Sequence, residues 1–375
     1  MSSVPVFVGL DYHQESIQVC VVNQDGAVLE NQSVANDAGV VHLLSVRHGV
    51  PTRIAIEACC GSADLAESLA VDWNLPIQMA HPGYVSRMKQ SPDKTDFGDA
   101  HLLADLARVN YVPKVWLAPR ETRELRRLIR HRGQLVKRRK ETKLRIRAIL
   151  RDNRLKYSLA RAWTKEWTRW LQEEAALAES DRWILDDHLT ELVSLSGRIG
   201  AVDAKIKIRT QDDPIVKRLL NEPGVGQVTA VTIRAEVGRF DRFHTGKQLA
   251  RFCGVTPRNA SSGKRQADAG LIRAGNPDLR VVLIELGHRL IRQANSPLAK
   301  LVYDMLNRGK PKNVVVAAVA NRFVRRLFHT MRSVPTVASD PAPLKGTAPS
   351  VITITSPCAG VKADVMATTK GAHPT

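Results

Sequence analysis

Apolar residues alternate along the beginning of the chain, and two of the alternating runs end at a carboxylate. Residues 6–10 lead to Asp11, and residues 53–58 end near Glu57. A period of two is typical of β-strands, because successive side chains point to opposite faces. Strands interleaved with helices predict a mixed α/β sheet domain over residues 1–115. Further strands are expected at residues 17–21, 28–29 and 76–80, and helices at residues 61–71 and 96–110.

The charge of this first part is opposite to that of the rest of the chain. The 375 residues carry a formal net charge of +19, with a sequence pI near 10.1. Residues 1–115 have 7 Lys/Arg against 13 Asp/Glu, a net of −6, so the remaining residues carry +25. An acidic domain attached to a very basic body suggests a cation site carried by a surface that binds nucleic acid.

Two more carboxylates stand near the end of the acidic part. Asp96 and Asp99 are three residues apart at the start of a predicted helix, so their side chains project from one face. With Asp11 and Glu57 they supply the hard oxygen ligands that Mg²⁺ prefers, and two such ions can assist phosphoryl transfer. Acids at strand ends plus an acidic pair on a helix are typical of an RNase H-like, RuvC-type nuclease site. The alternative is four ordinary surface acids.

Composition changes sharply after residue 115. Between residues 120 and 154 there are 15 Lys/Arg and only 4 Asp/Glu, and a thin apolar stripe at helical spacing predicts one long helix. So many like charges repel one another unless something neutralises them, which favours nucleic-acid backbone as the partner, with salt-dependent binding. Arg138, Arg139 and Lys140 are predicted contacts, and a solvated helix face is the alternative.

A second helical run, at residues 184–208, has apolar residues in alternating steps of four and three. This heptad seam and the basic helix together predict an antiparallel coiled coil within residues 116–210, with a plain helical hairpin as the alternative. Between the two helices, Trp163, Trp167 and Trp170 have a spacing that favours a buried helix face over stacking with bases. The seam residues are His188, Leu192, Leu195, Ile199, Val202 and Ile206.

Residues 211–334 are expected to form a mainly α-helical unit. A helix up to about residue 221 is followed by a Pro-Gly-Val-Gly turn and another helix, which looks like a helix-hairpin-helix DNA-binding motif; an ordinary helical turn is the alternative. Gly224 and Gly226 would let the backbone approach a phosphate. A further helical stretch is expected from residue 279 to about 332, and residues 335–375 have the composition of a disordered tail.

An irregular loop at residues 256–275 is rich in Gly, Ser and Arg. It contains Ser261 and Ser262, and a serine hydroxyl is a poor nucleophile unless a base, a metal or concentrated positive charge assists it. Arginines are able to clamp a phosphate under attack. Taken alone, Ser262 is an ordinary loop serine. The basic residues expected to contact nucleic acid around this loop are Lys264, Arg265, Arg273 and Arg280.

Other classes of protein fit the sequence poorly. No apolar run reaches the roughly 18 residues of a membrane-spanning helix, and the first residues lack the pattern of a signal peptide. The five cysteines are scattered, without the spacing of a zinc site or a disulfide framework. We therefore expect a cytoplasmic, nucleoid-associated protein with no membrane partner.

In combination these motifs resemble the DEDD transposases of the insertion sequence one-hundred-ten (IS110) family, to which Piv-type DNA invertases are related. The likeness covers about residues 4–330. It departs from the family pattern at Phe97-Gly98, where Arg-Ile is common, and in a loop after Ser262 with fewer glycines than usual. The segments that carry it are V-G-L-D at Asp11, I-A-I-E-A at Glu57, K-T-D-F-G-D-A at residues 94–100, P-G-V-G and S-S-G.

The resemblance implies a RuvC-like DEDD catalytic domain joined by a coiled coil to a C-terminal transposase domain. It implies that Ser262, or alternatively Ser261, is the nucleophile that becomes linked to DNA phosphate. A noncoding bridge RNA would pair with element and target DNA, and the protein would act as a dimer or tetramer. Two other functions remain open, a RuvC-like structure-selective nuclease that uses water and an inactive RNA-binding relic. The Mg²⁺ ligands implied are Asp11, Glu57, Asp96 and Asp99.

Overall fold

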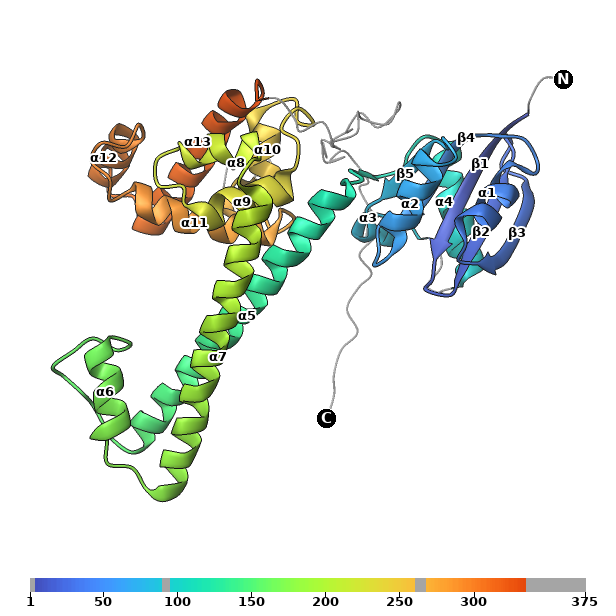
Figure 1. Ribbon diagram of the computed structural model, residues 1–375. Helices are drawn as coiled ribbons and strands as arrows, with labels where there is room; N and C mark the ends of the chain where they lie inside the picture. The colour runs from blue at the N-terminus through green and yellow to red at the C-terminus, as the bar shows by residue number, and fades with distance from the viewer. Residues whose placement is uncertain (1–3, 90–94, 260–267, 335–375) are drawn as a thin grey trace, which may run out of the picture.

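The computed structural model describes residues 4–89, 95–259 and 268–334. Four predicted site residues, Ser261, Ser262, Lys264 and Arg265, lie outside these ranges, as does the predicted tail at residues 335–375. The helices and strands fall into three parts: a sheet with helices at the N-terminus, a pair of long helices, and a helical C-terminal part (Figure 1).

Within the described residues, the N-terminal part contains a six-stranded sheet in the order β3-β2-β1-β4-β5-β6. Its strands are β1 (Pro5–Tyr12), β2 (Ser16–Val22), β3 (Val28–Ala35), β4 (Val50–Glu57), β5 (Ile77–Ala80) and β6 (Lys114–Val115). β1 pairs antiparallel with β2 and parallel with β4, so it lies inside the sheet. The pairs β2–β3 and β5–β6 are antiparallel, and β4–β5 is parallel.

Helices cover both faces of this sheet. On one face, α1 (Ala38–Val46) and α2 (Ser62–Val71) pack on alternate apolar residues of β1, β2 and β4. On the other face, α3 (Pro82–Met88) and α4 (Asp96–Arg108) pack on the residues in between. The strands therefore bury both sets of side chains, and the predicted mixed α/β class is confirmed. The sequence reasoning did not predict α1, α3 or the short strand β6.

Two long helices, α5 (Arg120–Asp152) and α7 (Glu179–Thr210), run side by side in opposite directions (Figure 1). Arg132 of α5 links the two helices, because its Nε lies 2.5 Å from an Asp203 carboxylate oxygen of α7. The predicted seam faces the contact: the residues buried between these helices are Leu135, Leu195, Ile199 and Ile206.

The far end of this pair carries α6 (Lys165–Glu173). Trp167 is buried there against α5 and α7, as its spacing predicted. Trp163, however, precedes the helix and has a positive φ of 72°, so the three tryptophans do not share one helix face. Its ring packs 4.7 Å from that of Trp167, and the Lys143 ammonium lies 4.6 Å above it.

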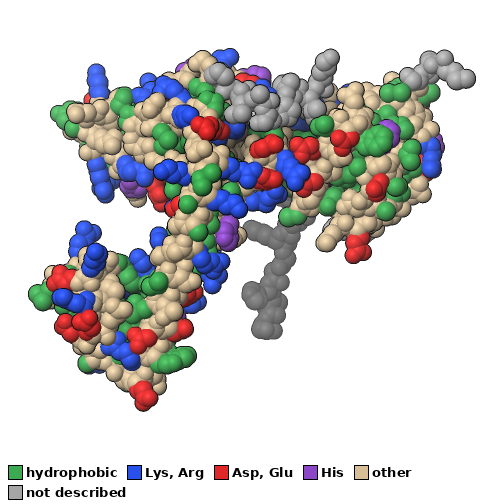
Figure 2. Space-filling model, viewed as in Figure 1, with side chains coloured by type: hydrophobic (Ala, Val, Ile, Leu, Met, Phe, Trp, Pro, Cys, Tyr) green, Lys and Arg blue, Asp and Glu red, His purple; other side chains and the backbone are tan. Residues whose placement is uncertain are grey.

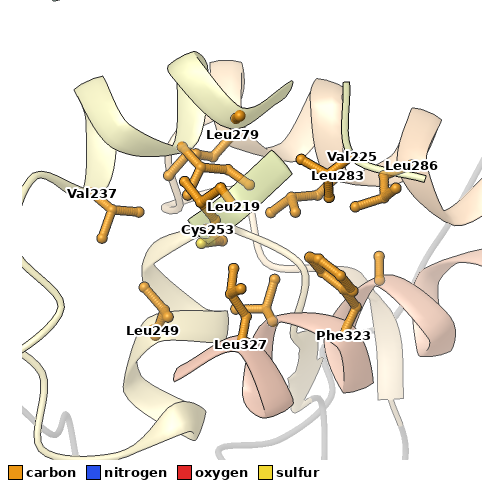
Figure 3. Packing of buried hydrophobic residues seen from close by; sticks show 14 of the residues in the cluster. Leu219, Val225, Val237, Leu249, Cys253, Leu279, Leu283, Leu286, Phe323 and Leu327 are labelled. Atoms are coloured by element: carbon orange, nitrogen blue, oxygen red, sulfur yellow. The ribbon is translucent and has the colours of Figure 1, made fainter. Parts of the chain in front are cut away.

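The C-terminal part is mainly helical, and its apolar side chains meet in one core (Figure 3). The predicted continuous helical finish is three helices, interrupted around Pro297 and Pro311. The predicted irregular loop at residues 256–275 begins and ends in a two-stranded antiparallel sheet. The elements are α8 (Pro214–Leu220), α9 (Gln227–Val237), α10 (Gly246–Phe252), β7 (Pro257–Asn259), β8 (Asp268–Leu271), α11 (Pro277–Leu290), α12 (Ala299–Asn307) and α13 (Lys312–Met331).

Trp116, just after β6, fixes the junction between the sheet and the helices. Two guanidinium groups lie over its ring, that of Arg126 at 5.5 Å and that of Arg242 at 4.9 Å from the ring centroid. A Cβ on Gly238 would lie 2.2 Å from the indole ring, so only a glycine fits there. On the other side of the junction, Arg123 of α5 lies 2.6 Å from a Glu67 carboxylate oxygen on α2. Among the described residues, no helix is long and apolar enough to cross a membrane.

Candidate metal centre and nucleic-acid surfaces

Asp11 and Glu57 end neighbouring parallel strands. β1 and β4 pair with Leu10 opposite Ile56, and the two acids follow these residues directly. Both are half-buried. Because the carboxyl ends of parallel strands meet at one edge of an open α/β sheet, this edge is where such folds place ligand sites. The structure therefore brings the two acids, far apart in sequence, to one sheet edge.

Asp96 and Asp99 occupy the first turn of α4. Thr95 caps this helix, because its Oγ1 accepts a hydrogen bond from the Gly98 N–H at 3.1 Å. Side chains three apart in a helix lie on one face. The cap thus fixes where the helix begins and with it the direction of both carboxylates.

A close contact at Gly9 brings α4 to the end of β1. A Cβ on this residue would lie 2.0 Å from the Ala100 carbonyl oxygen and 2.4 Å from the Ala104 nitrogen. Those are backbone atoms that a side chain cannot displace. The glycine therefore allows the helix to pack directly on the strand, two residues before Asp11.

Three side chains converge where β1 and α4 meet. The Nε2 of His13 lies 3.2 Å from an Asp11 carboxylate oxygen and 3.3 Å from an Asp96 carboxylate oxygen. One ligand atom from each of Asp11, His13 and Asp96 lies within 4.8 Å of the other two. Asp11 is the most enclosed of the three, with 15% of its side chain exposed. Among the described residues, this is the group with the geometry to hold a metal ion.

Burial dominates the electrostatics of Asp11. It raises the pKa of the Asp11 carboxyl above the usual 3.8, and the negative charges of Asp99 and Asp96 raise it further, while His13 opposes the shift. A carboxylate that is costly to ionise in this setting is stabilised by a nearby cation. Lys89 supplies positive charge next to Asp99, with its Nζ 2.6 Å from an Asp99 carboxylate oxygen. The donor set therefore suits a divalent cation.

The predicted carboxylates are not equivalent in this arrangement. Asp11 and Asp96 converge, and Asp99 is near enough to raise the pKa of Asp11, but it pairs with Lys89. Glu57 is not in the convergent group; with Asp11 it contributes to the raised pKa of Cys59, whose main cause is burial. All four acids are thus in one neighbourhood, at different depths.

His13 is the residue that the sequence reasoning missed. A signal was present, because residues two apart at a strand end point to the same side, and Asp-Tyr-His places an imidazole next to the carboxylate. Its approach to Asp96, however, depends on the packing of α4.

Basic side chains gather over the C-terminal helices and the adjoining stretch of the long helices on the face in Figure 2. On α5, the predicted contact Arg138 has a guanidinium nitrogen 3.6 Å from a Glu191 carboxylate oxygen of α7. Lys140 is exposed and Arg139 is half-buried. Arg138 is partly engaged with Glu191 within the protein, so Arg139 and Lys140 are the better candidates for contact with a nucleic-acid backbone.

The two glycines predicted to approach phosphate differ. Gly224 has a φ of +73°, and the space where a Cβ would stand is filled by Leu286 and Leu290 of α11, so it serves the core. Gly226 precedes α9 as its N-cap, and nothing lies within 4 Å of where its Cβ would stand. Only the second position faces open space.

Arg273 and Arg280 also differ. Arg273 is exposed. Arg280 directs its guanidinium at backbone carbonyls, donating from Nε to Gly254 at 3.0 Å and from Nη2 to Ile272 at 2.7 Å. That geometry gives Arg280 a structural role in the turn before α11, and its predicted contact with nucleic acid stays a prediction.

Two family models match the chain. One, described as "Transposase", matches residues 8–153, and the other, described as "Transposase IS116/IS110/IS902 family", matches residues 216–304. The first covers nearly all of the sheet and the whole of α5, and it includes the four predicted carboxylates. The second covers most of the helical C-terminal part.

Several proteins of similar sequence are also named as transposases. The chain is 28% identical over 319 residues to the transposase for insertion sequence element IS1111A of Coxiella burnetii, an alignment that covers 84% of this chain and 86% of the relative. It is 27% identical over 287 residues to a probable family 20 transposase of Pseudomonas aeruginosa, covering 74% and 83%. It is 23% identical over 286 residues to the transposase for insertion sequence element IS1328 of Yersinia enterocolitica, covering 73% and 82%.

Proposed function

Because this chain belongs to the IS110 family of transposases, we propose that it cuts and exchanges strands between its insertion sequence and target DNA through a covalent serine–DNA intermediate. Residues 1–115 form the catalytic domain with a RuvC-like arrangement, residues 116–210 a basic coiled coil, and residues 211–334 the transposase domain that carries the serine. The acids at adjacent strand ends and at the start of α4 support the first assignment.

The DEDD family implies a divalent metal ion, and the residues present fit one. Asp11, Glu57, Asp96 and Asp99 would hold Mg²⁺, which when bound supplies Lewis-acid polarisation of a phosphate and a lowered pKa for an attacking hydroxyl. Two observations support this fit. Asp11 and Asp96 converge, and burial disfavours the ionised form of Asp11 unless a cation lies nearby. β1, β4 and α4 pack together in one core, so these elements fix the positions of the carboxylates relative to one another.

Ser262 would be the nucleophile, with Ser261 as the alternative. Its Oγ attacks phosphorus, the Oγ–P bond forms as the bond to the 3′ oxygen breaks, and the serine proton is removed while the 3′ oxygen leaves as a hydroxyl. A later attack by a 3′ hydroxyl on the phosphoserine reverses this exchange with a new strand. Each step conserves the number of phosphoester bonds, so the sequence needs no ATP.

A noncoding bridge RNA would supply sequence specificity through base pairing, while the protein contacts its backbone. The exposed basic residues of α5 support this part of the proposal, since phosphate contacts carry affinity without sequence information. The length of α5 and α7 supports their use in pairing subunits into a dimer or tetramer.

The observation that carries the proposal is the convergence of carboxylates at the sheet edge in a chain of this family. The test is a recombination assay with purified protein, RNA transcribed from the DNA flanking the reading frame, element DNA, target DNA and Mg²⁺. Joined element–target strands that require both RNA and Mg²⁺ support it. Hydrolysed ends without joined strands identify a water-using nuclease instead, and RNA binding without any cleavage identifies an inactive relic.

A further inference from the structure

His13 stands at the meeting point of the two carboxylates that converge. Its Nε2 lies 3.2 Å from the Asp11 oxygen and 3.3 Å from the Asp96 oxygen, and all three ligand atoms lie within 4.8 Å of one another. In an octahedral site with bonds of about 2.1 Å, adjacent ligand atoms are about 3 Å apart and opposite ones about 4.2 Å apart. The observed spacings are close to those of three ligands on one ion.

The backbone of His13 is held in place independently of the acids. Its N–H donates to the Ser16 carbonyl oxygen at 2.9 Å, and its own carbonyl oxygen accepts from the Asn36 side-chain amide at 3.0 Å. The imidazole is therefore presented by a fixed turn at the end of β1. It keeps 40% of its side-chain surface exposed, which leaves space beside it for further ligands.

The lysine of this site is paired with another acid. The Nζ of Lys89 lies 2.6 Å from an Asp99 carboxylate oxygen. Asp96, by contrast, keeps 55% of its side chain exposed and directs one oxygen at His13. The site thus presents one nitrogen between two oxygens that come from different elements.

We infer that His13 is a metal ligand: its Nε2, with Asp11 and Asp96, forms a mixed nitrogen–oxygen site that favours Mn²⁺ over Mg²⁺. This rests on the proposed function, because it concerns the same carboxylate centre. Imidazole is a softer donor than carboxylate and binds transition metals in preference to Mg²⁺, which selects oxygen ligands. A centre of four carboxylates alone lacks this preference.

Pulsed electron paramagnetic resonance of Mn²⁺ bound to the full-length protein tests the inference. A nitrogen ligand produces a ¹⁴N modulation of the Mn²⁺ signal, and ¹⁵N-labelled histidine in the unmutated protein shifts its frequency. We expect both effects, and we expect the modulation to vanish in His13→Gln. The matched control is His101→Gln, because His101 lies on α4 of the same domain but 3.9 Å from a single carboxylate, Asp105. It should keep the modulation.

Titration of the same proteins gives the second measurement. His13→Gln should weaken Mn²⁺ binding about 10-fold or more, while Mg²⁺ binding, measured by competition with Mn²⁺, changes less than about 2-fold. Wild-type protein that binds Mn²⁺ without histidine nitrogen modulation overturns the inference and leaves the carboxylate centre standing. Mn²⁺ binding that is unaffected in Asp11→Asn contradicts the carboxylate centre itself. The ¹⁵N experiment needs no substitution, so a variant that fails to fold does not affect it.

Discussion

The sheet part and the helical part of this molecule use charge in opposite ways. At the sheet edge, carboxylates crowd together, and partial burial of Asp11 raises its pKa. In the helical part, charges are paired within the packing: Arg234 lies 2.6 Å from Asp213 and Arg326 lies 2.8 Å from Glu222, with at least one partner of each pair buried. Unbalanced negative charge therefore marks the candidate cation site, whereas much of the positive charge is structural.

Arg242 is the clearest case of a structural cation. Its guanidinium lies over Trp116, Phe243 and Phe252 at 4.4 to 4.9 Å from the ring centroids, and burial lowers its pKa to about 9. Its Nε donates to the Val237 carbonyl oxygen at 2.9 Å. The net charge of +19 therefore overstates the positive surface available to nucleic acid.

The largest effect should come from removing Asp11, the most enclosed of the convergent acids. Asp11→Ala should lower the rate of strand joining at least about 100-fold, because several kcal/mol of transition-state stabilisation depend on the metal that this carboxylate would hold. Asp25→Asn, at an exposed turn between β2 and β3, is the matched control and should keep full activity. RNA binding should be unchanged in both, measured by filter retention. Equal activity of Asp11→Ala and wild type would contradict a catalytic cation site at the sheet edge.

Glycine-to-alanine substitutions should have opposite signs in the two parts. Gly9→Ala places a Cβ against backbone atoms of α4 and should lower the free energy of unfolding by about 3 kcal/mol or more. Gly200→Ala, in the middle of α7 with open space around it, should raise it by about 0.5–1 kcal/mol. Urea unfolding of the full chain measures both. A free energy of unfolding that is unchanged or raised in Gly9→Ala would show that the contact at Gly9 does not hold α4 on the sheet.

Replacing basic residues of α5 tests whether these side chains bind nucleic acid or serve only the packing of the protein. Arg139→Ala combined with Lys140→Ala should weaken RNA binding and reduce the slope of log K against log salt by about 1.5–2, since each lost phosphate contact removes close to one unit. Arg47→Ala, an arginine of α1's C-terminus paired with Glu30 at 2.7 Å, is the control and should leave the slope unchanged. An unaltered slope in the double variant would exclude this stretch of α5 from the interface.

The smallest effects concern pH and again have opposite signs. Asp11 has a raised pKa, so the folded protein keeps its proton where the unfolded chain has lost it. Without divalent cations, its contribution to the free energy of unfolding should therefore fall as the pH rises from 3.8 through the raised value, and stay constant above it. Asp11→Asn should abolish this fall.

Asp241 in the helical part should behave in reverse. A hydrogen bond from Arg239 holds the pKa of its carboxyl below 3.8, so its contribution is present above pH 3.8 and is lost as the pH falls through the lowered value. Asp241→Asn should cost less than about 1 kcal/mol at neutral pH, because the pair is partly exposed. Melting curves of both variants and wild type across acidic pH measure the two slopes, and slopes of equal sign would contradict the assignment.

Local patterns were sufficient to predict strands β1 to β5 and the two long helices. Alternating residues before Asp11 and the heptad seam from His188 to Ile206 both correspond to buried faces. In each case one periodicity extends over several residues, and burial of one face follows from it. The carboxylates at the strand ends were found for the same reason.

Features that depend on packing between distant segments could not be predicted. His13 meets Asp96 only because Gly9 lets α4 lie directly on β1. The hydrogen bond that Arg280 donates to the Gly254 carbonyl oxygen likewise depends on the folded chain. Trp163 has helical spacing but a positive φ that places it outside α6. In these cases a residue's neighbours in space, rather than its neighbours in sequence, decide its role.

We propose that the sheet-edge carboxylates act with Ser262 to form a covalent link to DNA. Wild-type protein, Asp11→Ala, Ser262→Ala and Ser261→Ala are each incubated with flank-encoded RNA, labelled element DNA, target DNA and Mg²⁺, then denatured and separated on a gel. We predict a labelled protein–DNA band in wild type and Ser261→Ala that is absent from Asp11→Ala and Ser262→Ala. Metal-dependent cleavage without any such band, unchanged in both serine variants, would contradict the claim.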